Sequence, residues 1–133
     1  VDVAQRDIGR VGGLNEAMRV AQMARDRGKL IVPHCWKTGI GVAATAHLAA
    51  ATSNCRYIEF LPPLVAESAL RRELVEEELE ICDGRLDLPT RPGLGVQLNP
   101  SAVCRFERSA EEYAYHRPGS CPPALPASLV GTK

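Results

Sequence analysis

Short apolar runs alternate with amphipathic segments three times along residues 1–80, at about 25 residues per unit. The expected strands are Val1–Ile8, Leu30–Pro33 and Arg56–Phe60, and the expected helices are Leu14–Arg27, Val42–Ala51 and Glu67–Glu78. Because this alternation is typical of parallel strands joined by right-handed crossovers, it predicts an α/β fold. Three parallel strands cannot close a barrel, but they match the last three units of a (β/α)8 TIM-type barrel.

The pattern changes after residue 80. Residues 81–108 combine an Asp-Gly turn signal with short alternating runs, so we expect an irregular hairpin segment outside the repeat. Residues 109–133 are proline-rich and aperiodic, so we expect a disordered tail. The first residues already form a strand-like run and include no methionine, so we expect a piece of a longer protein.

Charge and cysteine content exclude several classes of protein. The 16 basic and 16 acidic residues balance, which gives no indication of a nucleic-acid or anionic-membrane partner. The longest apolar-rich stretch, Ile40–Thr52, is too short to span a bilayer, and no secretory signal is visible. Five cysteines with no CxxC pair fit no zinc pattern and favour a reduced, cytoplasmic protein over a disulfide framework.

An ionisable residue stands at the end of each expected strand: Asp7, His34 and Glu59. Active sites of (β/α)8 barrels draw residues from several strand ends at one face, and neighbouring strands lie about 4.8 Å apart. An aspartate beside a histidine fixes the imidazole tautomer and raises the basicity of the other nitrogen. The alternative for His34 alone is a structural histidine that caps a backbone carbonyl.

Other polar features have competing interpretations. Trp36 and Lys37 follow His34 on the same loop and could line a substrate cleft, or simply pack there. The segment Gly9–Gly13 precedes a helix and could bind an anion, but its spacing matches no phosphate-binding motif and favours a tight turn. Cys35 is expected to point to the opposite face from His34 and to be inert.

The stretches "DIGRVGGLNEA", "VPHCWKTGI" and "YIEFLPP" together resemble the end of the catalytic barrel of the enolase superfamily. Within that superfamily, the similarity is to the mandelate racemase/muconate lactonizing enzyme family, over about Val1 to Phe106. The stretch "RPGLGVQLNP" resembles the family's C-terminal segment, which returns toward a capping domain.

The resemblance implies that Asp7 and His34 form the family's Asp-His dyad and that Glu59 hydrogen-bonds the substrate carboxylate. The complete enzyme would use Mg²⁺ to remove the proton next to the carboxylate of an acid sugar or hydroxy acid through an enediolate. Dehydration is the first expectation for the outcome, with racemisation or cycloisomerisation second. Full-length members are expected to be homo-oligomers.

The family's metal ligands and second base lie on strands that this sequence does not contain, so no metal ligand is expected here. We therefore expect this chain alone to bind no catalytic Mg²⁺ and to be inactive. One alternative is a truncated remnant without enzymatic function, held together by self-association. Another is a complete small α/β domain that binds an anion at its glycine turn.

Overall fold

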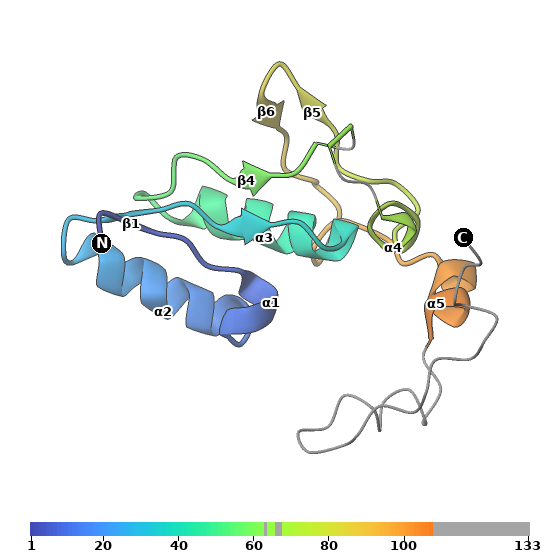
Figure 1. Cartoon of the computed structure of the whole chain (residues 1–133), viewed down its shortest axis with the longest axis horizontal. Helices are drawn as coiled ribbons and strands as arrows, with labels where there is room; N and C mark the ends of the chain where they lie inside the picture. The colour runs from blue at the N-terminus through green and yellow to red at the C-terminus, as the bar shows by residue number, and fades with distance from the viewer. Residues whose placement is uncertain (63, 66–67, 108–133) are drawn as a thin grey trace, which may run out of the picture.

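The computed structural model of the chain describes residues 1–62, 64–65 and 68–107 (Figure 1). The tail predicted over residues 109–133 lies outside them. The elements, in chain order, are β1 Val3–Ala4, α1 Ile8–Val11, α2 Leu14–Arg25, β2 Leu30–Ile31, β3 His34–Cys35, α3 Gly39–Ala51, β4 Glu59–Phe60, α4 Ala69–Glu73, β5 Ile81–Cys82, β6 Arg85–Leu86 and α5 Pro100–Phe106.

Three extended segments lie side by side and run in the same direction. β1 pairs with β2 and β3 pairs with β4, both in parallel. Two further parallel bridges, Asp7 with His34 and Ile31 with Cys55, join these pairs, so the segment that contains β2 and β3 lies in the middle. The parallel pairing predicted from the alternation is therefore confirmed.

Helices α2 and α3 lie next to each other and cover one face of these segments (Figure 1). Alanines make this close approach possible: Ala21 and Ala24 of α2 pack on Ile31, which is fully buried. Ala17 of α2 joins Ala44 and Leu48 of α3 in a second cluster. Small side chains on both helices let them approach the strands and each other closely.

One charged residue also lies on the covered face. Arg6 is buried there, and its Nη1 atom donates a hydrogen bond to the carbonyl oxygen of Ala17, 3.3 Å away. Burial lowers the pKa of the Arg6 guanidinium, because removal from water disfavours its charged form. The bond to the α2 backbone offsets part of the cost of this burial.

The first strand ends earlier than predicted. Asp7 is the N-cap of α1, and its side chain accepts a hydrogen bond from the backbone N–H of Gly9, so Ile8 is already helical. The predicted turn at Gly9–Gly13 therefore begins as a short helix. Gly12 and Gly13 then form the turn to α2 with φ angles of 106° and 92°, a region that favours glycine.

The helix predicted over Glu67–Glu78 is present but much shorter, as α4 Ala69–Glu73. In the described part of this segment, α4 ends at Glu73, and Val75 forms an antiparallel bridge with Leu98 instead. Val75 is buried against Gly39, where an added Cβ would lie 2.4 Å from Val75 Cγ2. This packing outweighs the local helix propensity.

The last described segment returns along the molecule. β5 and β6 are antiparallel, joined by a turn at Asp83 and Gly84 with φ angles of 50° and 72°. Helix α5 follows, capped by Asn99, whose side chain accepts from the backbone N–H groups of Ser101 and Ala102. This helix was missed, although asparagine before Pro100 is a recognisable helix start.

Arg71 of α4 connects the segment that begins at about Val75 and leads back along the molecule, called the return segment below, to the end of β4. Its Nε atom lies 2.9 Å from Oε1 of Glu78, and its Nη1 atom donates to the carbonyl oxygen of Leu61. Its guanidinium group also lies 4.5 Å from the centre of the Phe60 ring. One buried side chain therefore holds the chain just after Glu59 in place.

Candidate functional site

The three predicted strand-end residues lie in one row across the sheet. Asp7 forms a parallel bridge with His34, and His34 is the register partner of Glu59. The structure therefore brings Asp7, His34 and Glu59 to the same level of three neighbouring segments, as expected for parallel strands that end at one edge.

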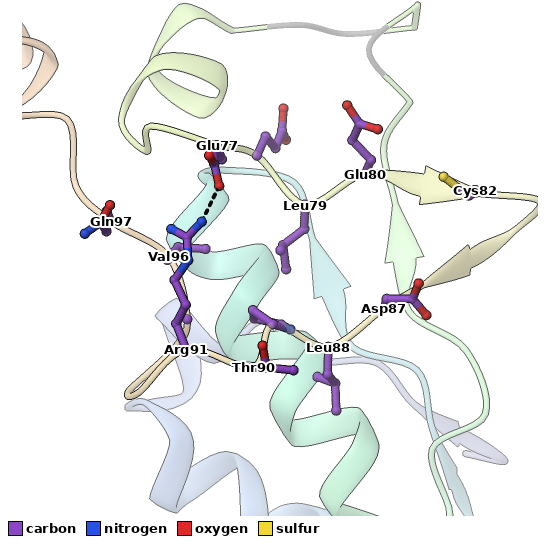
Figure 2. Close-up of a pocket in the computed structure, with 13 residues that line it drawn as sticks. Glu77, Leu79, Glu80, Cys82, Asp87, Leu88, Thr90, Arg91, Val96 and Gln97 are labelled. Atoms are coloured by element: carbon purple, nitrogen blue, oxygen red, sulfur yellow. Dashed lines mark hydrogen bonds and ion pairs between the residues drawn. The ribbon is translucent and has the colours of Figure 1, made fainter.

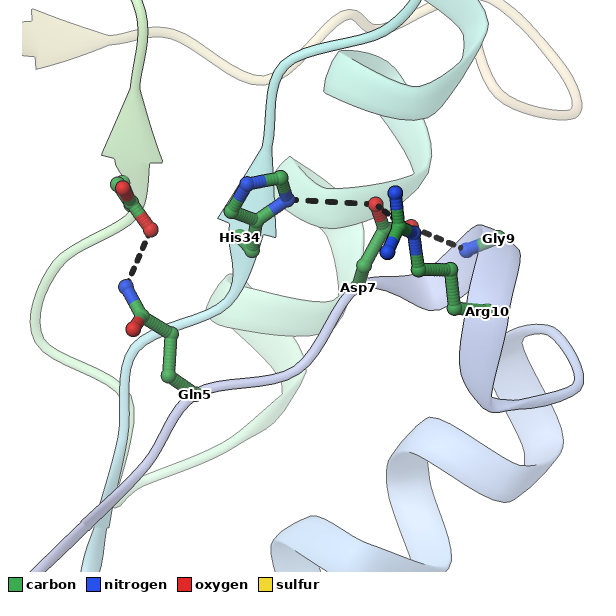
Figure 3. A network of polar contacts seen from close by, with 6 residues as sticks. Gln5, Asp7, Gly9, Arg10 and His34 are labelled. Atoms are coloured by element: carbon green, nitrogen blue, oxygen red, sulfur yellow. Dashed lines mark hydrogen bonds and ion pairs between the residues drawn. The ribbon is translucent and has the colours of Figure 1, made fainter.

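Asp7 and His34 are in direct contact. Nδ1 of His34 lies 3.3 Å from Oδ2 of Asp7, and both side chains are half-buried or better (Figure 3). Because a carboxylate can only accept, the proton of this hydrogen bond belongs to Nδ1. In the neutral ring, Nε2 is then the nitrogen with a free lone pair.

The carboxylate of Asp7 is fixed by further contacts. Its Oδ1 atom accepts a hydrogen bond of 2.8 Å from the backbone N–H of Gly9, and Arg10 Nε lies 3.8 Å from Oδ2 (Figure 3). A Cβ on Gly9 would lie 3.2 Å from Oδ1, so a larger residue would crowd this bond. The start of α1 therefore orients Asp7, and Asp7 orients His34.

Trp36 lies against the imidazole ring of His34. The two ring centroids are 4.4 Å apart at an interplanar angle of 33°, and Trp36 is 41% exposed. Lys37 is exposed on the same loop and, within the described residues, has no ion-pair partner. The structure thus places Trp36 beside the dyad but does not bring Lys37 into contact with it.

Gln5 is a site residue that the sequence analysis missed. Its Nε2 atom donates a hydrogen bond to Oε2 of Glu59 (Figure 3). The signal was present, since Gln5 stands two residues before Asp7 and side chains at i and i+2 of an extended segment share a face. Gln5, Asp7, His34 and Glu59 therefore form one row of polar side chains, called the polar row below.

Cys35 lies on the opposite side of the sheet from this row. It is buried, and burial raises the pKa of its thiol above the ordinary value of 9.0. Its burial under the helices confirms the prediction that Cys35 lies on the other face from His34. A thiol that stays protonated is a poor nucleophile, so this environment opposes reactivity of Cys35.

A separate hollow of about 420 Å³ lies within the return segment (Figure 2). Glu77, Glu80, Asp87, Thr90, Arg91 and Gln97 are among its lining residues. Arg91 pairs with Glu77 across it, at 2.7 Å between Nη2 and Oε2. None of the strand-end residues contributes to this hollow, so it is not part of the polar row.

Known proteins share this fold and this segment of sequence. The family model described as "Enolase C-terminal domain-like" matches residues 1–102. The chain belongs to the mandelate racemase/muconate lactonizing enzyme family of the enolase superfamily. The resemblance noted from the motifs around Asp7, His34 and Glu59 is thereby confirmed, and the fold is the α/β fold of the enolase C-terminal domain, which matches part of a TIM barrel.

Two curated relatives carry the names of enzymes of sugar-acid chemistry. D-galactarolactone cycloisomerase of Agrobacterium fabrum is 32% identical over 111 residues, which are 80% of this chain and 29% of that protein. Arabinonate dehydratase of Saccharolobus solfataricus is 37% identical over 98 residues, 74% of this chain and 25% of the dehydratase. The chain therefore spans less than a third of the length of these relatives.

A solved enolase-superfamily structure from Pseudomonas fluorescens Pf0-1, with bound magnesium, potassium and tartrate, has a TM-score of 0.66 and 28% identity to this chain. The match covers 79% of this chain and 25% of that one.

Among the described residues, the strand-end carboxylates do not fit a magnesium site. Both carboxylate oxygens of Asp7 are used, by Gly9 and His34, and Oε2 of Glu59 accepts from Gln5. Mg²⁺ requires near-octahedral oxygen ligands, and no group of three or more candidate ligands gathers among the described residues. Over the same residues, no helix has the length and apolar character needed to cross a membrane.

Proposed function

We propose that this chain supplies the base and one carboxyl group of an enolase-superfamily active site that removes the proton next to the carboxylate of an acid sugar. The observation that supports this most directly is the hydrogen bond between His34 Nδ1 and Asp7 Oδ2, in one row with Glu59. Relatives of the same family that act on acid sugars support the substrate class.

In this mechanism His34 is the catalytic base. Its Nε2 atom takes the proton from the carbon next to the substrate carboxylate, and the electron pair of that C–H bond moves into the carboxylate to form an enediolate. Asp7 keeps Nδ1 protonated and stabilises the imidazolium that forms. The hydrogen bond from Gly9 N–H to Asp7 holds this pair in place before the substrate arrives.

Glu59 hydrogen-bonds the substrate carboxylate as it gains charge, and Trp36 and Lys37 line the substrate cleft. Trp36 is held against His34 and can shield the base from water. Lys37 is free of ion pairs within the described residues, so its ammonium group is available to a substrate carboxylate or hydroxyl. In the complete protein, we expect Mg²⁺ to be bound by residues outside this chain, and we expect none to be bound by this chain.

Dehydration of an acid sugar is the proposed outcome, because arabinonate dehydratase has the higher identity of the two curated relatives compared. Racemisation and cycloisomerisation are the alternatives. The fate of the enediolate depends on an acid on the opposite face of the substrate, which Asp7, His34 and Glu59 do not supply.

The chain alone is proposed to be inactive, with residues 1–80 as barrel units and residues 81–108 as the segment that returns toward a capping domain. The strand face opposite the helices is open, and Val3 and Leu30 on it are 45% and 38% exposed. An inactive remnant that associates through this face is therefore the second candidate. The complete protein is proposed to be cytoplasmic and homo-oligomeric.

A chimera tests this proposal. The matching quarter of arabinonate dehydratase is replaced by this chain. Loss of the substrate α-proton is then followed by NMR in D2O with Mg²⁺ and a panel of acid sugars. We expect exchange in the chimera, a rate roughly 10³-fold lower in its His34→Asn variant, and none from the chain alone. A folded chimera that exchanges equally well without His34 would contradict the proposal.

A further inference from the structure

Gln5 and Glu59 are joined across the full width of the three-segment sheet. Gln5 lies between β1 and Asp7, whereas Glu59 lies on β4, and the segment with His34 runs between them. Two strand spacings separate the outer segments by about 10 Å. Only two long side chains that reach toward each other can close this gap, and the hydrogen bond from Gln5 Nε2 to Glu59 Oε2 does so.

This bond gives the two oxygens of Glu59 different surroundings. Oε2 accepts from an amide of Gln5, and among the described residues Oε1 has no hydrogen-bond partner. A glutamate at a strand end otherwise turns about three side-chain bonds, and the second attachment restricts that freedom. The amide of Gln5 does not titrate, so it can hold Glu59 whether that carboxyl group is ionised or protonated.

We propose that Gln5 is a positioning residue, which holds Glu59 by Oε2 so that Oε1 faces the substrate carboxylate. The inference rests on the function proposed above and deepens it. When Glu59 carries a proton on Oε1, that O–H donates to a substrate carboxylate oxygen, while Oε2 acts as the carbonyl oxygen that accepts from Gln5. Gln5 acts through Glu59 and does not touch the reacting atoms.

The first test uses the 133-residue chain and observes glutamine side-chain amides by ¹H–¹⁵N NMR. The Glu59→Met variant removes the acceptor and is expected to shift the Gln5 amide protons upfield. Gln22 is an internal control, because its Nε2 atom donates to Asp26 Oδ1 at 2.7 Å, far along the chain from Glu59. A Gln5 signal that moves no more than that of Gln22 would overturn the proposal.

The second test uses the chimera described above. Gln5→Met keeps the length of the side chain and removes the donor, and Gln22→Met is the matched control on the surface of α2. We expect Gln5→Met to lower kcat/KM for α-proton exchange about tenfold, mainly through kcat, with no change from Gln22→Met. Partial recovery in Gln5→His, which restores an N–H donor, would support a positioning role.

The outcomes separate the two proposals. If His34→Asn abolishes α-proton exchange while Gln5→Met has the same kcat/KM as Gln22→Met, the proposed role of Gln5 is wrong and the proposed function stands. If the folded His34→Asn chimera exchanges as well as the chimera that keeps His34, the proposed function is wrong and the role of Gln5 falls with it.

Discussion

The two faces of the three parallel segments differ in almost every respect, although they are built from neighbouring residues. Leu30 and Ile31 are adjacent in sequence, yet Leu30 is 38% exposed and Ile31 is fully buried under α2. Apart from the buried Arg6, the covered face is made of small and aliphatic side chains in close contact. The open face carries the polar row of Gln5, Asp7, His34 and Glu59.

This difference follows from the period of two along a strand, which sends each successive side chain to the other face. On the covered face, free energy depends on volume and contact, so substitutions there should change stability. On the open face, hydrogen bonds are partly exposed to water, so substitutions there should change orientation and chemistry with a small effect on stability.

The largest effect is expected for Ile31→Ala. Removal of three carbons from a fully buried site should lower the free energy of unfolding by about 3 kcal/mol, because the cavity between β2 and α2 cannot collapse. The matched variant Leu30→Ala should cost less than about 1 kcal/mol. Urea titrations of both variants measure this, and equal losses would mean that the two faces are not distinct.

A smaller loss is expected for Gly39→Ala, at the start of α3. Its Cβ would lie 2.4 Å from Val75 Cγ2, so overpacking should lower the free energy of unfolding by about 2 kcal/mol. Gly41→Ala, two residues on, meets only Thr38 Oγ1 at 3.5 Å and should be stabilising by about 0.5 kcal/mol. Val75→Ala should rescue Gly39→Ala in thermal melts; failure to rescue would contradict the assigned clash.

Substitutions of Asp7, on the open face, should have a small effect on the free energy of unfolding and a clear effect on the orientation of His34. Asp7→Ala removes the N-cap of α1 and should cost about 1 kcal/mol, whereas Asp7→Asn keeps a capping oxygen for Gly9 and should cost less than about 0.5 kcal/mol. Both variants remove the carboxylate that orients His34. Circular dichroism melts give the stabilities, and the imidazole ¹⁵N shifts of His34 should change in both variants.

The smallest effect is expected from the pH dependence of Cys35. Because burial raises the pKa of its thiol in the folded state, the associated stability is fully present below 9.0 and is lost as pH rises through the folded value. Denaturation at pH values from about 8 to about 10.5 should show a fall that Cys35→Ala reduces. Iodoacetamide at about pH 8 should label the exposed Cys82 and Cys104 before Cys35.

The sequence was informative wherever local pattern and tertiary structure agree. The apolar runs before Asp7 and His34 and the helical spacing of Ala17 and Ala21 predicted both the parallel segments and the residues at their ends. Asp7, His34 and Glu59 could be placed in one row because parallel strands end at a common edge. Their catalytic roles remain a proposal.

The sequence was uninformative where distant contacts decide the structure. Nothing local to Val75 shows that it packs on Gly39, so a helix was predicted where the chain pairs with Leu98 instead. The bond from Gln5 to Glu59 joins residues 54 positions apart, and only the assembled sheet brings them together. Residues whose role depends on a partner across the sheet are thus the ones that pattern alone cannot assign.

The register of the middle segment has a consequence for how this chain can change over evolution. His34 faces one way and Cys35 the other, and each neighbouring strand is matched to them residue by residue. Insertion of a single residue between Ile31 and His34 would turn both side chains to the other face, with the imidazole on the helix-covered side and the thiol on the open side. Homologous chains should therefore tolerate substitutions between Ile31 and His34, but the number of residues between these two positions should stay constant.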